Sequence, residues 1–171
     1  MKSFLQLVLA VALGVSALCA AEAPKKNWTP PTYKLYAQVL SDQIMAQHPE
    51  LISVTLHGVP PGMDKVYTMF AGSFPERIGN PDDPDDAMVC ELGVEILDSR
   101  WNRLKDPVKK FVMMMSLRDA AGQHCGLLVL AYKNSGANAH SEREFFTMAS
   151  DLRDALQKQI PSYAALYEKA K

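Results

Sequence analysis

His57 and Arg77 are the first residues in this sequence that could bind a ligand or take part in chemistry. His57 ends a run of alternating apolar and polar residues, shortly before a Pro-Pro-Gly turn, and Arg77 follows in an irregular segment. A histidine at a strand end can line a pocket, coordinate a metal or simply hydrogen-bond a nearby carbonyl. Arg77 can bind an anionic group through two parallel hydrogen bonds, or pair with a neighbouring acid. These alternatives stay open for both residues.

Four carboxylates in five residues, Asp82-Asp83-Pro84-Asp85-Asp86, form a dense acidic group. Oxygen ligands of this kind suit Ca²⁺, but the segment lacks the spaced acids, central glycine and terminal glutamate of an EF-hand loop. Two prolines favour a solvated turn that leads into a helix, with Asp83 or Asp85 as its N-cap. We therefore regard Asp82, Asp83, Asp85 and Asp86 as weak metal candidates. No His-x-x-x-His or Cys-x-x-Cys spacing indicates a zinc site.

Three adjacent methionines, Met113, Met114 and Met115, could suggest soft ligands for haem or copper. On a strand Met114 points away from its neighbours, so the three cannot converge on one ion, and flexible filling of the core is the expected role. The chain has no Gly-x-Ser-x-Gly elbow and no glycine-rich phosphate loop. No particular cofactor is indicated. An enzymatic hypothesis would have to use His57 with the acidic segment or with a bound metal.

The first twenty residues have the three parts of a secretory signal. Lys2 supplies the positive start, residues 4–15 the short apolar run, and residues 16–23 the small-residue exit. We expect cleavage between Ala20 and Lys25, export to the periplasm or the extracellular space, and a polar leader over residues 21–31. A retained N-terminal anchor is the alternative. No later segment approaches the roughly 18 apolar residues of a span, so we expect no membrane span after cleavage.

Export changes the interpretation of the cysteines. Cleavage removes Cys19 and leaves Cys90 and Cys125, an even pair in an oxidising compartment. The two either form a disulfide or are buried thiols that pack as small hydrophobic residues. The separation of their Cα atoms decides between these alternatives, and spacing in the sequence does not reveal it.

A single domain over residues 32–171 is expected to position these groups. Apolar residues recur at steps of three and four over 32–48, which is typical of an amphipathic helix. Ser141 and Glu144 form a capping box that begins the last long helix, and Pro161 ends it. Further elements are expected as strands at 51–59, 66–74, 94–97, 110–117 and 124–132, with a short helix at 85–92 and a tight turn at 119–122.

The strand that carries His57 determines what the histidine faces. Apolar and polar residues alternate over 51–59, which is typical of a half-buried strand. The alternation places Ile52, Val54 and Leu56 on one face and Ser53, Thr55 and His57 on the other.

The order of elements predicts an α+β fold, an antiparallel sheet with the N- and C-terminal helices packed on one face. The 171 residues carry a formal net charge of −1, so no basic field attracts nucleic acid. A small molecule is the expected ligand, and a homodimer through the terminal helices is the protein partner that we consider.

The end of the chain resembles a known group of folds. Residues 112–117, then Arg118-Asp119-Ala120-Ala121-Gly122, then Gly126-Leu127-Leu128-Val129-Leu130, then residues 142–156 look like the closing hairpin and helix of GAF domains. More broadly, they resemble the PAS, GAF and Cache group of sensor folds, which are profilin-like in architecture. The Asn-Lys…Phe…Asp-Glu pattern of cyclic-nucleotide-binding GAF domains is absent. Export brings the chain nearer to Cache-type extracytoplasmic sensors.

The resemblance implies a ligand pocket on the sheet. One sheet face must pack the terminal helices, and the crossover at 72–93 would then cover the other as a lid. We predict that His57, Arg77 and Tyr132 border one cavity, with Arg77 on the lid side, and that Met115 contributes to the same ligand site. The leading hypothesis is an exported, non-enzymatic ligand-binding or sensing domain. The alternatives are an exported enzyme or redox or metal-binding protein, and a structural adaptor that assembles through its terminal helices.

Overall fold

The computed structural model describes residues 25–97 and 107–171. The expected signal sequence over residues 1–20, and the first four residues of the leader that follows it, lie outside the described residues. Among the described residues the chain forms three α-helices, five strands and three short 3₁₀ turns. In chain order the elements are α1 Tyr36–Gln47, β1 Leu51–Gly58, β2 Thr68–Gly72, η1 Pro75–Arg77, α2 Pro84–Leu92, β3 Ile96–Leu97, β4 Lys110–Arg118, β5 His124–Lys133, η2 Gly136–Asn138, α3 Glu142–Gln157 and η3 Ala164–Tyr167.

The strands form one antiparallel sheet in the order β2-β1-β5-β4-β3. Its centre is the β4–β5 hairpin, whose register pairs Met113 with Leu130 and Met115 with Leu128. The Asp119 carboxylate accepts hydrogen bonds from the backbone N–H groups of Ala121 and Gln123, at 3.0 and 2.9 Å, and so closes the turn. The predicted hairpin is confirmed.

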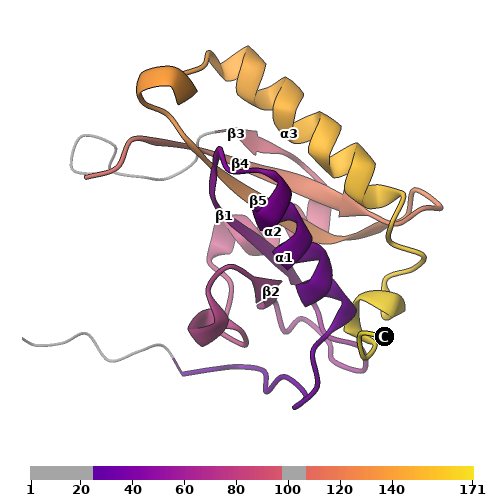
Figure 1. The fold of residues 1–171 in the computed structure, drawn as a ribbon. Coiled ribbons are helices and arrows are strands. Elements are labelled where there is room, and N and C mark those ends of the chain that lie inside the picture. Colours follow the sequence, from indigo (N-terminus) through magenta and orange to yellow (C-terminus); the bar gives the residue numbers. More distant parts are fainter. Residues whose placement is uncertain (1–24, 98–106) are drawn as a thin grey trace, which may run out of the picture.

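Helices α1 and α3 cover one face of the sheet, and α2 lies on the other (Figure 1). Ser141 and Glu144 make the predicted capping box at the start of α3. The main core lies under α1 and α3, and it includes Leu40, Ile44, Phe145, Leu152 and Leu156 from these helices. The chain is therefore α+β, with its terminal helices on one side of an antiparallel sheet, as predicted.

The opposite face carries a smaller apolar cluster under α2. Val89 is fully buried there against Val112, Met114 and Leu127. Asp83 is the N-cap of α2 and forms a capping box with Asp86. Gly93 ends the helix with φ +64°, a left-handed conformation that glycine adopts without steric cost. Each sheet face therefore has its own core.

An irregularity in β1 corrects the predicted alternation. The pairing of β1 with β5 shifts between Leu51 and Ser53, so that Ile52 is an extra residue in the ladder. Ile52 consequently packs with the α2-side cluster, on the same face as Ser53. The prediction that Ile52 shares a face with Val54 and Leu56 was wrong, because one bulge exchanges the faces of the residues on either side of it.

The segment expected to be a polar leader contacts the domain from Asn27 onward. The backbone N–H groups of Asn27 and Trp28 donate to the carbonyl oxygen of Gly79, at 2.9 and 3.3 Å. The Trp28 ring meets Tyr167 edge to face, with 6.0 Å between centroids. Among the described residues, no helix combines the length and the apolar character that a membrane crossing requires.

Candidate functional site

An open cavity of about 290 Å³ lies on the sheet face opposite α1 and α3. Its floor is apolar and comes from β1, β4 and β5, and its polar groups come from β1, η1, the start of α2 and the start of β4. This combination of an apolar floor with a few convergent polar groups is typical of small-molecule sites. The lining residues are Ile52, Ser53, Thr55, His57, Phe74, Arg77, Asp86, Lys110, Val112, Val129 and Ala131.

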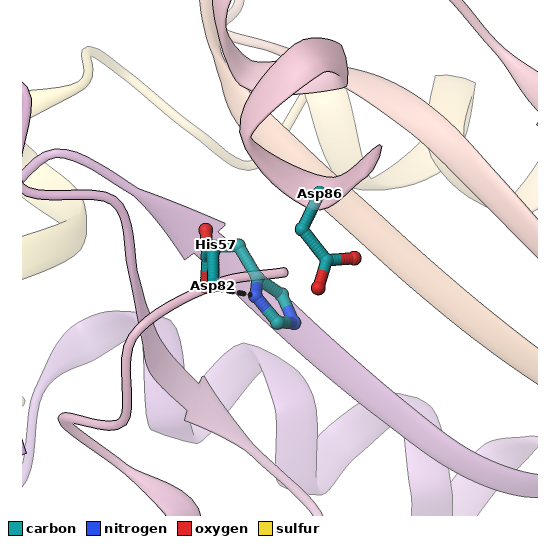
Figure 2. Close-up of side chains that lie close together, drawn as sticks. All are labelled: His57, Asp82 and Asp86. Atoms are coloured by element: carbon teal, nitrogen blue, oxygen red, sulfur yellow. Dashed lines mark hydrogen bonds and ion pairs between the residues drawn. The ribbon is translucent and has the colours of Figure 1, made fainter. Parts of the chain in front are cut away.

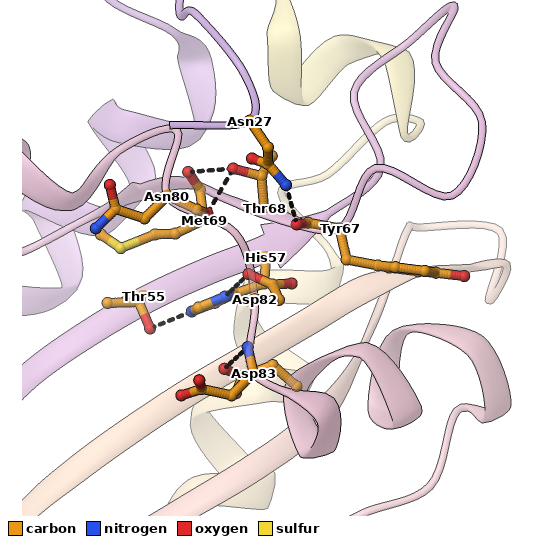
Figure 3. A network of polar contacts seen from close by, with 10 residues as sticks. Asn27, Thr55, His57, Tyr67, Thr68, Met69, Asn80, Asp82 and Asp83 are labelled. Carbon is orange, nitrogen blue, oxygen red and sulfur yellow. Dashed lines mark hydrogen bonds and ion pairs between the residues drawn. The ribbon is translucent and has the colours of Figure 1, made fainter. Parts of the chain in front are cut away.

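His57 is held at both nitrogens of its imidazole ring. Nδ1 donates to the Asp82 carboxylate at 2.7 Å, and Nε2 lies 2.8 Å from the Thr55 hydroxyl (Figures 2 and 3). Thr55 and His57 are two residues apart on β1, so both side chains point to the cavity face. The His57 side chain is only 7% exposed. The imidazole therefore has a fixed orientation at the wall of the cavity.

Asp82 reaches His57 because the segment before it is tied to β2. The Thr68 hydroxyl donates to the carbonyl of Asn80 at 2.8 Å, and the backbone N–H of Asp82 donates to the carbonyl of Tyr67 at 3.1 Å (Figure 3). An isolated antiparallel bridge between Thr68 and Pro81 completes this attachment. The Asp82 side chain is fully buried, and its second carboxylate oxygen, Oδ2, has no hydrogen-bond partner.

The position of His57 on β1 depends on a glycine in the neighbouring strand. Gly126 of β5 has φ +129°, and a Cβ atom there would lie 2.2 Å from the carbonyl oxygen of His57. Only glycine leaves room for this close approach of the two backbones. In the ladder between β1 and β5, His57 pairs with Leu127, the residue that follows Gly126.

The charges around His57 raise the pKa of its imidazole above the usual value. Burial by itself lowers this pKa, because it disfavours the charged form. The Asp82 carboxylate outweighs that effect through its charge and its hydrogen bond, and Asp86 adds to it, whereas Arg77 opposes it. Asp82 and His57 therefore form a buried pair whose ionised form persists to higher pH than for an isolated histidine.

Arg77 lies at the rim of the cavity. It is an exposed residue at the end of η1, and its guanidinium stands over the Phe74 ring at 5.4 Å from the centroid. This cation–π contact holds the side chain near the opening. Lys110, at the start of β4, lines the same cavity. The rim can therefore attract an anionic group, while Asp86 presents a carboxylate deeper in the cavity, where it is 4% exposed.

The structure brings together only some of the predicted ligand-binding residues. His57 and Arg77 line one cavity, with Arg77 on the side of the crossover. Tyr132 and Met115 lie on the opposite sheet face, where Tyr132 contacts Phe145 with 5.4 Å between ring centroids. The prediction that both border the cavity was wrong, because they lie on the face of β4 and β5 that packs against α1 and α3. The smaller Val129 and Ala131 form the floor instead.

Eight lining residues were not among the predicted site residues: Ile52, Ser53, Thr55, Phe74, Lys110, Val112, Val129 and Ala131. The alternation in β1 already placed Ser53 and Thr55 on the face of His57, and this was the available signal. Lys110 starts a strand that is distant in sequence, and Phe74 precedes the irregular segment. No local pattern connects either of these to His57.

The acidic segment divides between two groups that could each hold an ion. His57, Asp82 and Asp86 form one, and Asp83, Asp85 and Asp86 form the other; within each, the candidate ligand atoms all lie within 4.8 Å of one another. The first group is buried, apart from the backbone of Asp82, and the second is partly exposed. Asp83 and Asp86 also cap α2, so the capping interpretation of this segment is confirmed.

Cys90 and Cys125 are free thiols in the structure, although both line one small cavity of about 210 Å³ with Tyr163. Burial raises the pKa of both thiols, to about 12 for Cys125. Of the two alternatives for this pair, the structure has the packed thiols rather than the disulfide. Cys125 belongs to the core on the side of α1 and α3, and Cys90 packs against the cluster under α2.

Comparison with known proteins gives little further information. No protein-family model matches the chain, and no curated protein matches it. A similar solved structure is the crystal structure of the repressor BlcR from Agobacterium tumefaciens, at 12% sequence identity and a TM-score of 0.43. The similarity covers 75% of this chain and 68% of that chain. A similarity at this level does not bear on function.

Proposed function

We propose that this protein is an exported, non-enzymatic binding domain for a small molecule, with a fold of the PAS, GAF and Cache type. The observation that supports it is the cavity of about 290 Å³ between the sheet and the crossover. The N-terminal sequence supports export to the periplasm or the extracellular space. The β4–β5 hairpin followed by α3 supports the resemblance in fold.

The lining predicts the class of ligand. Ile52, Val112 and Val129 supply an apolar floor, and Arg77 supplies a cation at the rim, where its guanidinium stands over the Phe74 ring. His57 is paired with Asp82 and adds little net charge. The best match is a small molecule with an apolar body and at least one anionic group, such as a carboxylate, which an arginine binds through two parallel hydrogen bonds.

Native mass spectrometry of the mature protein, purified from the cells that export it, tests this function. We expect a retained organic molecule on the unmodified chain. The Arg77→Met variant should lose it, because it lacks the cation at the rim. The Arg143→Met variant is the matched control, since Arg143 is an exposed arginine on α3, across the sheet from the cavity.

Equal retention in both variants would contradict the ligand site. So would the absence of any retained molecule together with unchanged thermal stability in a panel of small carboxylates. The same spectra measure the oligomeric state and so test the expected homodimer. A dimer that persists with no ligand bound would favour the alternative of a structural adaptor.

A further inference from the structure

We propose that His57, Asp82 and Asp86 form a binding site for a divalent transition-metal ion at the polar end of the cavity. The three come from separate parts of the chain: β1, the segment attached to β2, and the first turn of α2. The fold thus brings one imidazole nitrogen and two carboxylates to one place. Figure 2 shows the two carboxylates flanking the His57 ring.

The geometry of the donors suits a metal ion. One ligand atom from each residue lies within 4.8 Å of the other two, a spread that an ion between them can span with small side-chain movements. The ion would replace the proton that His57 Nδ1 now donates to Asp82, and that proton would pass to solvent. All three side chains are shielded from solvent: Asp82 is 0% exposed, and His57 and Asp86 are buried. Donors that are fixed by surrounding structure lose little freedom when they bind an ion.

A second observation points to a cation. Oδ2 of Asp82 is buried and has no hydrogen-bond partner. A buried carboxylate oxygen without a partner is costly, because it has lost its hydration and gained nothing in return. A metal ion beside the imidazole would give this oxygen a positive partner and would offset the charge of two neighbouring carboxylates.

The set of donors indicates the class of metal. Ca²⁺ and Mg²⁺ prefer oxygen ligands alone, whereas one imidazole with two carboxylates suits Zn²⁺, Mn²⁺ or Fe²⁺. Three protein ligands leave coordination positions open. His57 and Asp86 line the cavity, so these positions would face it and could take water or an anionic group of a bound molecule.

The experiment uses the mature chain after treatment with a chelator, with Zn²⁺ alone as the probe in calorimetric titration. We expect one Zn²⁺ per chain. The Asp82→Asn variant should bind it at least about tenfold more weakly, because a direct ligand is lost. Asp85→Asn is the matched control, since Asp85 belongs only to the more exposed acidic group, and its affinity should equal that of the unmodified protein.

A measurement on the unmodified chain provides independent support. Mn²⁺ bound at this site should show coupling to an imidazole nitrogen in pulsed electron paramagnetic resonance, and the His57→Gln variant should lose this coupling. This readout decides the matter even where Asp82→Asn fails to fold, which thermal melting of each variant reveals.

Two outcomes would overturn the proposal: no nitrogen coupling in the unmodified protein, or a greater loss of Zn²⁺ affinity in Asp85→Asn than in Asp82→Asn. The second result would assign the ion to the exposed acids. Neither outcome affects the organic ligand, which the Arg77→Met experiment tests without added metal, so the two proposals fail separately.

Discussion

At the scale of single residues, the environment determines which groups are available for chemistry. His57 and Cys125 are buried and Cys90 is partly buried, but these residues differ in what surrounds them. His57 contacts a carboxylate and a hydroxyl through its two ring nitrogens, so it has polar partners that hold it at the cavity wall. For the two thiols, desolvation is the largest cause that raises the pKa, and nearby carboxylates add to it, so both thiols stay protonated near neutral pH.

Cys90 and Cys125 are therefore expected to be free thiols that react slowly in the folded protein. Burial raises the pKa of Cys125 to about 12, and it raises the pKa of Cys90 as well. The reactive thiolate is consequently scarce near neutral pH, and its fraction increases as the pH rises. Maleimide labelling followed by mass spectrometry should show slow reaction when folded and complete reaction of both after unfolding without a reductant. A requirement for reductant would instead demonstrate a disulfide.

At the scale of elements, two local structures position the site and the core. The close approach of β5 to β1 at Gly126 aligns the strand that carries His57 with its neighbour. The capping box of α3 determines where the last helix begins, and hence which of its residues, such as Phe145, face the sheet. One substitution can disrupt the close approach at Gly126, and another can remove the capping box of α3. The stability of each variant can then be compared with that of a matched control.

Gly126→Ala should destabilise the protein more than Gly122→Ala. Both glycines have positive φ, +129° and +81°, so alanine strains the backbone at either position. At Gly126 the new Cβ would also meet the His57 carbonyl oxygen at 2.2 Å, whereas nothing lies within 4 Å at Gly122. Urea unfolding measures the difference. Equal losses of stability would contradict the close approach.

Ser141→Ala should lower the free energy of unfolding by about 1 kcal/mol, since Ser141 caps α3. Ser135→Ala is the control, because Ser135 precedes η2 without a side-chain capping bond and is exposed. Its effect should stay within about 0.5 kcal/mol.

The same cap makes the effect of Ser141→Ala depend on pH. Hydrogen bonds from Ser141 hold the pKa of Glu144 below its usual value. The stability that this carboxylate contributes is therefore present above its unfolded-state pKa and is lost as the pH falls through the folded-state pKa. The gap in unfolding free energy between Ser141→Ala and the unmodified protein should narrow in acid. A gap that widens on acidification would contradict this assignment.

At the scale of the whole molecule, the sheet is covered on both faces, but unequally. Two long helices cover one face, and α2 with the crossover covers only part of the other (Figure 1). The uncovered part is the cavity beside His57. A cavity is present here because the second layer is short and irregular.

Methionine oxidation tests this arrangement. Met113 and Met115 are buried under α1 and α3, and Met114 is buried under α2, whereas Met63 and Met88 are 44% and 40% exposed. Mild peroxide treatment followed by peptide mass spectrometry should therefore oxidise Met63 and Met88 well before the three strand residues. Oxidation of Met114 as fast as Met88 would show that α2 does not cover this face.

Much of the secondary structure could be predicted from the sequence because its causes are local. The Asp119–Gly122 turn, the Ser141–Glu144 capping box and the end of α2 at Gly93 each depend on a few neighbouring residues, and all are present in the structure. The order of these elements was enough for the α+β class and for terminal helices on one face. The β2 and β3 strands are shorter than predicted, because their outer residues lack partners in the ladder.

The composition of the site was decided by tertiary structure. Alternation divides the residues of a strand into two sets, but it does not say which set faces the helices, so Tyr132 and Met115 were assigned to the wrong side. The bulge at Ile52 has no sequence signal of its own. Asp82 is 25 residues from His57, and the two meet only because hydrogen bonds to β2 guide the intervening segment. Contacts of this kind depend on the path of the whole chain, and local propensity does not encode that path.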